Sequence, residues 1–450
     1  MKYDLVIQNG KVVLEDKVIH SNIGIKDGKI ADVFESDQFI ADNVIDANNK
    51  YVMPGAIDTH THFFEPGASY REDFEHGTKA AASGGFTCIM EMPNSNPAVV
   101  DLETFEMKRK FAEKGAVIDY ALWGGATATN LDNLDILKNL GCIALKGFTL
   151  YAGTAFPYLN TEMQMDAMKK VKALNMILGF HAEDPVIVKT LTEKYQSQSW
   201  NLKIHDMSRP YYAELAAISQ ILLFSKETGC PVHICHLSIP EGAELISKAK
   251  QDNVNVTVES CSHYFLLNYE DYYQYDTYAL IQPPIRSRRR MDNMWKYLMN
   301  GTIDYLATDH APYTEEEKEP ENGNKWDVMG GSPSIDVAFP MMFDETVIKR
   351  GMDPIQFVKL SSTNAAKRFG MYPRKGSICK GADADIVILN PNEPWIIDRS
   401  KSFSKSKNTK FPYQGRKVNC KVNTTLVRGN VVYNNGQITV DNGHGILIKP

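Results

Sequence analysis

The sequence lacks the features of membrane-spanning and nucleic-acid-binding proteins. No run of apolar residues among the 450 approaches the length that crosses a bilayer. Positive charge is not in excess, because 49 Lys and Arg residues face 55 Asp and Glu residues and the net charge is −6. The one basic cluster, residues 286–290, is interpreted as a short solvated patch. We therefore expect neither a membrane nor a nucleic-acid partner.

Cysteine is scarce, and its distribution does not indicate a disulfide framework. The seven cysteines are odd in number and lie in apolar contexts, for example at Cys88, Cys142 and Cys235. The first ten residues are too few and too polar to form a signal peptide. A cytoplasmic location is therefore expected.

A glycine-rich phosphate-binding turn is also missing after the first strand of the central region, which argues against a doubly wound open sheet. Short apolar stretches alternate there with segments of helical spacing such as 161–174, 211–228 and 240–251. This α/β pattern predicts a (β/α)₈ TIM barrel. The eight expected strands are 56–62, 86–93, 117–125, 142–148, 176–183, 231–238, 256–264 and 303–312.

The two ends of the chain carry a different pattern. Short alternating runs in the first 52 residues are broken by turn signals at Asn9-Gly10, Asp27-Gly28 and Asn48-Asn49, and apolar runs return at 384–389 and 425–433. We interpret the two ends as one small β-sandwich. The predicted domains are 1–54 (N-terminal part of the sandwich), 55–369 (barrel) and 370–450 (C-terminal part of the sandwich).

Two histidines, His60 and His62, end the first expected barrel strand. Side chains two residues apart on a strand point to the same face, so both imidazoles can be aimed at one point. Neutral imidazole is the commonest protein metal ligand. Taken alone the pair also fits two unrelated histidines, but barrel enzymes place their chemistry at this end of the strands.

Ligand-capable side chains recur at the same end of later strands. Lys146 ends the fourth, His181 the fifth, His233 or His236 the sixth and Asp309 the eighth. Each has a simpler interpretation, because a lysine can extend its amine to solvent, a histidine can be a core residue and an aspartate can cap a helix. It is less expected that every one of these separate interpretations is correct at matching strand ends than that the residues form one shared site.

These residues resemble the set found in the cyclic amidohydrolases, which include dihydropyrimidinase or hydantoinase, allantoinase and dihydroorotase. The resemblance covers nearly the whole chain and is also carried by residues 77–87, 282–286, 308–312 and 364–370. It implies a metal-dependent hydrolase that opens the amide bond of a ring ureide or imide.

The resemblance also implies two Zn²⁺ ions bridged by Lys146, whose amine has reacted with carbon dioxide. The family pattern selects His236 over His233, which faces the opposite way on a strand. Asp309 would be general base and acid, taking a proton from the water that gives the metal-bridged hydroxide and passing it to the ring nitrogen. The implied metal ligands are His60, His62, Lys146, His181, His236 and Asp309.

Other residues are expected to contact the substrate. Tyr151 matches the hydantoinase tyrosine that donates to the developing oxyanion, and a tyrosine packed in a loop is the alternative of near-equal weight. The remaining substrate-binding residues expected are Asn94, Gln282, Met329 and Gly330.

The identity of the ring is the open question. Phe64 stands where dihydroorotases have the arginine that pairs the substrate carboxylate, and Arg71 is a candidate substitute. Residues 260–266 and 412–416 resemble allantoinases, whereas residues 369–376 resemble hydantoinases. We rank allantoin or a 5-substituted hydantoin first, a dihydropyrimidine next and dihydroorotate last.

Two other classes stay open. One is a non-catalytic scaffold relative of dihydropyrimidinase that has lost metal ligands, and the other is an amidohydrolase for acyclic N-acyl amino acids. All six ligand positions are filled, which favours the enzyme. Because relatives are commonly dimers or tetramers, a homodimer or homotetramer is expected.

Overall fold

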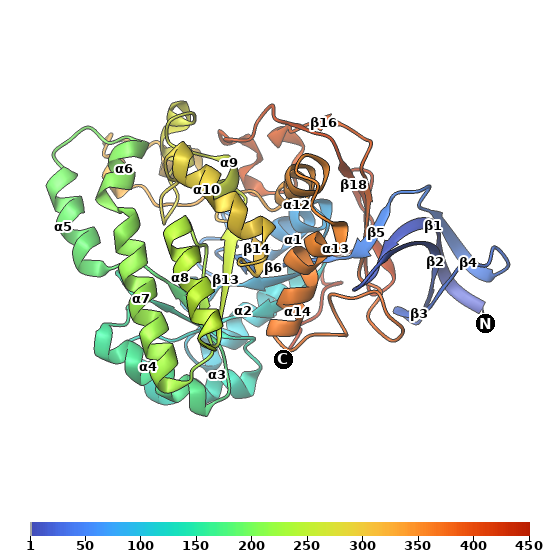
Figure 1. Ribbon diagram of the computed structural model, residues 1–450, viewed down its shortest axis with the longest axis horizontal. Helices are drawn as coiled ribbons and strands as arrows, with labels where there is room; N and C mark the ends of the chain where they lie inside the picture. Colours follow the sequence, from blue (N-terminus) through green and yellow to red (C-terminus); the bar gives the residue numbers. More distant parts are fainter. Residues whose placement is uncertain (1) are drawn as a thin grey trace.

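Eight parallel strands form the central barrel of the computed structural model, which describes residues 2–450 (Figure 1). Neighbours pair in parallel, and the short strand β9 (Gly124–Gly125) continues β8 and pairs with β10. The ring closes where the His62 N–H donates to the His310 carbonyl at 2.8 Å. The strands are β6 (Ala56–Thr61), β7 (Phe86–Glu91), β8 (Asp119–Leu122), β10 (Leu145–Phe148), β11 (Leu178–His181), β12 (Val232–Ile234), β13 (Val256–Cys261) and β14 (Tyr305–Ala307). The predicted TIM barrel is confirmed.

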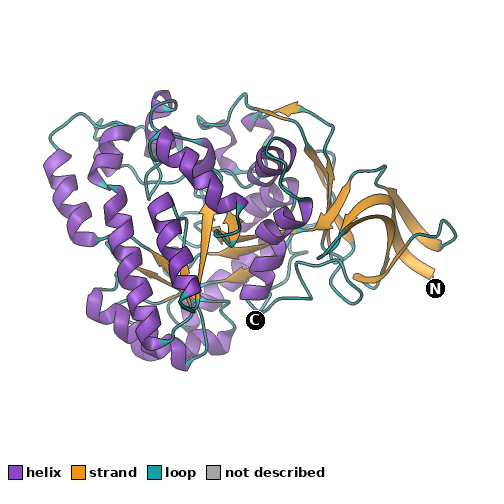
Figure 2. Ribbon diagram, viewed as in Figure 1, coloured by secondary structure: helices purple, strands orange, loops and turns teal. Residues whose placement is uncertain are grey.

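Helices cover the outside of this barrel (Figure 2). The segments with helical spacing are α4 (Thr161–Ala173), α7 (Tyr211–Thr228) and α8 (Pro240–Gln251), as predicted. Asn160 caps α4 by accepting from the backbone of its third residue, and Gly229 ends α7 in the left-handed conformation. The other α-helices are α1 (Phe74–Ser83), α2 (Leu102–Gly115), α3 (Leu134–Leu140), α5 (Pro185–Tyr195), α6 (Leu202–Ser208), α9 (His263–Leu266), α10 (Arg288–Met299), α11 (Glu315–Lys318), α12 (Ala338–Phe343), α13 (Pro354–Val358) and α14 (Asn364–Arg368).

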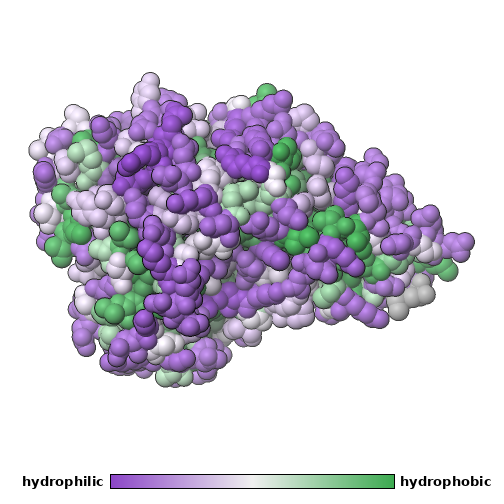
Figure 3. Space-filling view, viewed as in Figure 1, coloured by the Kyte–Doolittle hydropathy of each residue, from purple (hydrophilic) through white to green (hydrophobic). Residues whose placement is uncertain are grey.

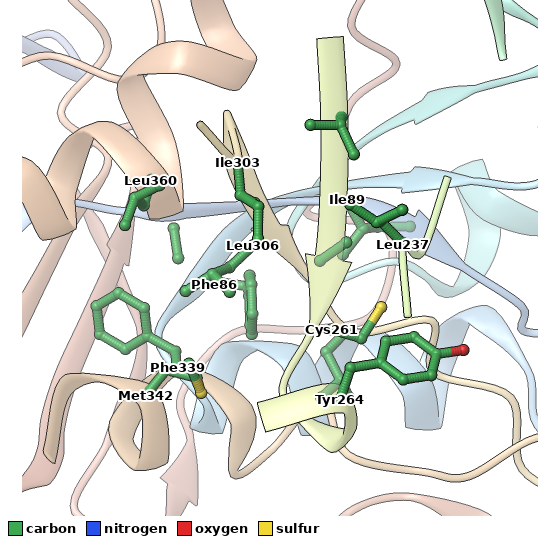
Figure 4. Packing of buried hydrophobic residues seen from close by; sticks show 14 of the residues in the cluster. Phe86, Ile89, Leu237, Cys261, Tyr264, Ile303, Leu306, Phe339, Met342 and Leu360 are labelled. Carbon is green, nitrogen blue, oxygen red and sulfur yellow. The ribbon is translucent and has the colours of Figure 1, made fainter. Parts of the chain in front are cut away.

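An apolar core lies between the strands and the helices. Figure 4 shows Phe86 of β7 and Leu306 of β14 beside Phe339 and Met342 of α12. The rings of Phe86 and Phe339 are 6.3 Å apart, and all four side chains are buried. Burial of such side chains is the main favourable contribution to folding, so it fixes the barrel on which the strand ends are held.

The two ends of the chain share one nine-stranded sheet, which confirms the predicted β domain built from both termini. Strand β5 (Tyr51–Pro54) joins the halves, because it pairs in parallel with β1 and antiparallel with β15. The other strands are β1 (Lys2–Val13), β2 (Val18–Lys26), β3 (Lys29–Phe34), β4 (Ile40–Asp46), β15 (Ile386–Asn390), β18 (Lys421–Val427), β19 (Asn430–Asn434) and β20 (Gln437–Ile438). A separate ribbon pairs β16 (Trp395–Ile396) with β17 (Lys417–Val418). The domain limits at 54 and 369 stay a prediction.

Two of the three expected turns are present. Asp27-Gly28 joins β2 to β3 and Asn48-Asn49 lies between β4 and β5, all four residues with positive φ. The turn expected at Asn9-Gly10 is wrong, because β1 runs through it with a bulge against β2. Asn9 does have a φ of 57°, but the bulge absorbs that conformation without reversing the chain.

The last residues of the chain lie against the barrel. The Ile448 N–H donates to the Tyr120 carbonyl at 2.7 Å, and the Tyr120 N–H donates to the Ile446 carbonyl at 3.1 Å. The tail therefore pairs in parallel alongside β8. In Figure 1 the C-terminus lies under the barrel, away from the N-terminus.

A buried charged cluster joins the sheet to the barrel. The Lys375 ammonium lies 2.5 Å from Asp119 of β8 and 2.5 Å from Asp385, which directly precedes β15. Arg428, which follows β18, also pairs with Asp119. Opposite charges therefore neutralise one another in this interior position, as buried charges require.

None of the helices within residues 2–450 combines the length and hydropathy that a membrane span needs. On the face drawn in Figure 3, hydrophilic residues predominate and hydrophobic ones form separate patches.

Candidate metal centre

Three potential metal ligands meet where β6 and β14 end. His60 is the fifth residue of β6 and His62 directly follows the strand, so both rings point to the same side. Their Nε2 atoms are 3.2 Å apart. The Oδ1 atom of Asp309, which follows β14 in the left-handed conformation, is 3.2 Å from Nε2 of His62 and 3.5 Å from Nε2 of His60. One atom from each residue can therefore reach a single cation.

A second group lies beside the first, at the ends of β10, β11 and β12. The Nδ1 atom of His181 is 3.1 Å from the Nε2 atom of His236, and the rings of His236 and His60 are 5.2 Å apart. Lys146 of β10 is 1% exposed, and its Nζ has no hydrogen-bond partner among the described residues. Lys146 lines the same cavity as both groups of potential ligands, so it is placed to contribute to a metal site in either group.

Two buried carboxylates lie behind the histidines and set their tautomers. Glu259 lies 2.5 Å from Nδ1 of His60, and Glu183 lies 2.7 Å from Nε2 of His181. Each carboxylate accepts the proton of its imidazole, so the other ring nitrogen keeps a lone pair that faces the cavity. This support is typical of metal-ligating histidines.

The electrostatics of the site favour neutral imidazoles and an ionised aspartate. Burial lowers the pKa of His60 to about 4, with the Lys146 charge adding to the shift and Glu259 opposing it. Burial also lowers the pKa of His181 and of His236. Burial acts to raise the pKa of Asp309, but the neighbouring imidazoles hold it well below its usual range. Neutral imidazole and carboxylate are the forms that bind metals.

Two other groups of potential ligands have different roles. Cys235 lies near His60 and Glu259, but neither Cys235 nor Glu259 lines the cavity, and Glu259 is already bound to Nδ1 of His60. The aspartate cluster around Asp119 already surrounds the ammonium of Lys375.

His233 turns away from the cavity, as the alternation along its strand predicts. Its Nδ1 atom is 3.0 Å from the Tyr305 hydroxyl and 3.2 Å from the Thr257 hydroxyl, both within the barrel. Its side chain is fully buried and is absent from the cavity lining.

One cavity of about 100 Å³ at the strand ends is lined by all the predicted metal ligands and substrate-binding residues, but not by His233 or Arg71. Tyr151 is 68% exposed, which puts it at the mouth. The residues brought together are His60, His62, Asn94, Lys146, Tyr151, His181, His236, Gln282, Asp309, Met329 and Gly330. Their proximity is observed, and their individual roles stay predictions.

Sequence reasoning missed several supporting residues. Arg209, from the residues that follow α6, lines the cavity and binds Glu183 through Nε at 3.1 Å. Tyr313 forms part of the opposite wall. A signal existed for the carboxylates, because Glu183 follows His181 by two residues and Glu259 is a charge within an apolar strand. Arg209 and Tyr313 have no such local signal, since only the fold brings them to the cavity.

Comparison with known protein families places the chain in a class of enzymes. Residues 51–432 match the amidohydrolase family, so the chain belongs to this family and is a metal-dependent hydrolase of amide bonds. The predicted resemblance and enzyme class are thereby confirmed.

Individual relatives agree with this assignment. The chain is 37% identical to allantoinases of Salmonella choleraesuis and Salmonella newport, over 100% of this chain and 98% of theirs. An L-hydantoinase (dihydropyrimidinase) from Arthrobacter aurescens superposes with a TM-score of 0.96 at 30% identity, and each chain is fully covered. A dihydropyrimidinase from Brevibacillus agri superposes with a TM-score of 0.92 at 28% identity, covering 99% of this chain and 98% of the other.

Proposed function

We propose that this enzyme hydrolyses the ring amide bond of a cyclic ureide, with allantoin or a 5-substituted hydantoin as substrate. The observation that carries this proposal is that two histidine groups and the buried Lys146 line one cavity. The similarity to allantoinases over the whole chain and the fold of a hydantoinase support this choice of ring.

Two Zn²⁺ ions fit the donor set of the cavity. His60, His62 and Asp309 would hold one ion, His181 and His236 the other, and Lys146 would bridge them. Imidazole and carboxylate are preferred zinc ligands. The buried Lys146 Nζ, which has no partner among residues 2–450, supports the bridging role. When bound, the ions supply Lewis acidity that polarises an amide carbonyl and acidifies water.

Lys146 would act as a carbamate. Its uncharged amine attacks the carbon of carbon dioxide, an N–C bond forms and the nitrogen loses a proton, which leaves an anion with two oxygens. Lys146 is buried and its Nζ has no hydrogen-bond partner in residues 2–450, so no neighbouring side chain competes for this nitrogen.

Three side chains would handle the substrate. Asp309 accepts the proton of the attacking water and passes it to the departing ring nitrogen. Tyr151, at the mouth, donates to the oxygen of the attacked carbonyl. Asn94 lines the cavity with a buried Oδ1 atom that has no partner in residues 2–450, so it is available to a ring N–H.

A ring that carries a carboxylate is disfavoured, because the arginines near the cavity are already paired with glutamates. Phe64 lies over His62, with ring centroids 6.0 Å apart, where an arginine would be needed. Arg71 is bound to Glu317 at 2.5 Å, and Arg209 is bound to Glu183. A buried substrate carboxylate without a free cation costs several kcal/mol, which ranks dihydroorotate last.

A dihydropyrimidine is the second candidate ring, since solved structures with this fold include a dihydropyrimidinase. The scaffold alternative is disfavoured because all six donor residues line one cavity. The acyclic alternative is decided by the substrates that the enzyme hydrolyses. Fewer than one equivalent of zinc per chain after expression in zinc-supplemented medium would favour a scaffold.

A substrate panel tests the proposed function. Purified enzyme supplied with zinc and bicarbonate is assayed for ring opening with allantoin, hydantoins, dihydrouracil, dihydroorotate and N-acyl amino acids. We expect the highest kcat/KM with allantoin or a 5-substituted hydantoin and the lowest ring opening with dihydroorotate. Hydrolysis of N-acyl amino acids alone would contradict the proposal.

We also propose a homodimer or homotetramer in the cytoplasm. The seven cysteines are all unpaired and six are buried, which suits a reducing compartment. Light scattering coupled to gel filtration tests the assembly, and a monomeric mass would contradict it.

A further inference from the structure

The short helix α11 contacts two segments of the chain that each contribute residues to the cavity lining. A capping box of Thr314 and Glu317 begins the helix. The Glu317 carboxylate also accepts hydrogen bonds from the Arg71 guanidinium at 2.7 Å and from the Tyr70 hydroxyl at 2.8 Å. One side of the helix is therefore fixed to the segment that follows β6.

The last residue of α11, Lys318, reaches the other wall. Its side chain is 3% exposed although it belongs to a run of charged residues that the sequence alone would put in solvent. Its ammonium donates to the Met329 carbonyl at 3.0 Å and to the Gly331 carbonyl at 2.9 Å, and it lies 5.0 Å from the ring centre of Tyr313. Burial lowers the pKa of Lys318 to about 7, with Glu317 opposing that shift.

The segment that Lys318 holds is a wall of the cavity. Met329, Gly330 and Tyr313 all line it. A Cβ atom at Gly330 would lie 2.8 Å from the Gln282 side chain, and one at Gly331 would lie 2.7 Å from the Ala311 carbonyl. The wall is thus packed against both neighbouring loops, and the Gly331 N–H donates to the Leu280 carbonyl at 2.9 Å, which leaves the Met329 and Gly331 carbonyls to be held by Lys318.

We propose that Lys318 is a positioning residue that fixes the peptide groups of residues 329–331 as the wall against which the substrate ring lies. This role rests on the proposed function for its substrate. Two hydrogen bonds from one buried amino group orient the Met329–Gly330 and Gly331–Ser332 peptides together, because the acceptors belong to alternate residues. Lys318 does not line the cavity, so it acts through the wall rather than on the reacting atoms.

Lys318→Met tests this role, because methionine keeps most of the side-chain volume and removes the donors. Loss of two hydrogen bonds from a buried donor predicts a KM for the preferred ring that is about tenfold higher or more. An interaction that holds the wall equally in ground and transition states changes KM and leaves kcat within about threefold. The matched control is Lys325→Met, which removes a half-exposed cation paired with Asp276 in the same loop region and should leave KM unchanged.

Hydrogen–deuterium exchange supplies a readout that does not need activity. Amides in a peptide spanning 326–336 should exchange faster in Lys318→Met than in wild type, while amides of α8 stay unchanged. If the wild type opened no ring, the proposed function would fail and this exchange would still test Lys318.

Lys318→Gln covers the case in which the methionine variant does not fold. Its amide keeps a polar group at the buried site but is too short to serve both carbonyls, so KM should rise to an intermediate value. Metal content should equal that of wild type in every variant. A KM no higher than that of Lys325→Met, unchanged exchange at 326–336, or a parallel loss of kcat and metal would overturn the proposal.

Discussion

At the residue scale, Lys146 is a buried amine without a hydrogen-bond partner in the part of the chain that the structure describes. Its side chain is buried, and its nitrogen contacts no carboxylate among residues 2–450. Four imidazoles and Asp309 surround the same cavity. The proposed conversion of the amine to a carbamate would give this position a negative charge, which suits the two cations proposed for the cavity.

Replacement of this lysine tests the bridge. We expect Lys146→Ala to lower activity by more than about 100-fold, because loss of residues that only support metal ligands already costs up to that much. The variant should also bind less zinc. Short carboxylic acids such as propionate should restore part of the rate, because their two oxygens replace those of the carbamate. Steady-state assays and elemental analysis measure both effects. Equal rescue by methylamine, or turnover like that of wild type, would contradict the bridging role.

Glu259 lies outside the cavity but contacts His60, one of the proposed metal ligands. It accepts from the Thr59 hydroxyl at 2.5 Å while it holds Nδ1 of His60. In Glu259→Gln the amide no longer fixes the imidazole as a carboxylate does, so zinc affinity should fall by about 10–100-fold. Competition with a chromophoric chelator measures the affinity. The control is Glu244→Gln, which alters an exposed pair with Lys248, and equal affinities in the two variants would refute this role.

At the scale of elements, one glycine links the sheet to the first barrel strand. Gly55 lies between β5 and β6, and a Cβ atom there would be 2.1 Å from Cγ2 of Thr87 on β7. Its carbonyl accepts from the Ser362 hydroxyl at 2.6 Å. The strand that carries His60 can enter the barrel at this angle only because the side chain is absent.

Gly55→Ala should therefore lower the free energy of unfolding by about 1–3 kcal/mol through overpacking. Thermal or urea denaturation measures the loss. The double variant Gly55→Ala/Thr87→Ala should recover part of it, because the colliding atoms of Thr87 are removed. An alanine at residue 55 that leaves stability unchanged would show that this junction is not tightly packed.

The sequence predicted the elements that carry chemistry better than those that support it. His60, Lys146 and His181 could be found because their residue types are unusual at the ends of apolar strands. Arg209 and Lys318 could not, since each acquires its role from contacts across long stretches of chain. The turn expected at Asn9-Gly10 failed for a related reason, because a positive φ also suits a bulge that only the pairing with β2 reveals.

At the scale of the whole molecule, the C-terminal part of the chain is fastened to the barrel in several places. Besides the Lys375 cluster, Glu345 pairs with Lys349 at 2.7 Å and Arg350 at 2.5 Å on its own helical segment. It also pairs with Arg416 at 2.7 Å, which lies directly before β17. Although burial acts to raise the pKa of Glu345, these cations lower it to about 2.

This shift predicts a defined acid dependence of stability. Because the pKa in the folded protein is below the ordinary value of 4.5, the contribution is present above pH 4.5 and is lost as the pH falls to about 2. The difference in unfolding free energy between wild type and Glu345→Gln should shrink over that interval. Urea denaturation at several pH values measures it, with exposed Glu162→Gln as control. A difference that stays constant would contradict the ion-pair network.

The central claim is a dinuclear zinc centre bridged by a carboxylated Lys146. Crystals of the enzyme grown with zinc and bicarbonate, measured at the zinc absorption edge, test it most directly. The account predicts two anomalous peaks, one beside His60, His62 and Asp309 and one beside His181 and His236, with electron density for a carbamate on Lys146 between them. A single peak, or an unmodified lysine between two ions, would contradict it.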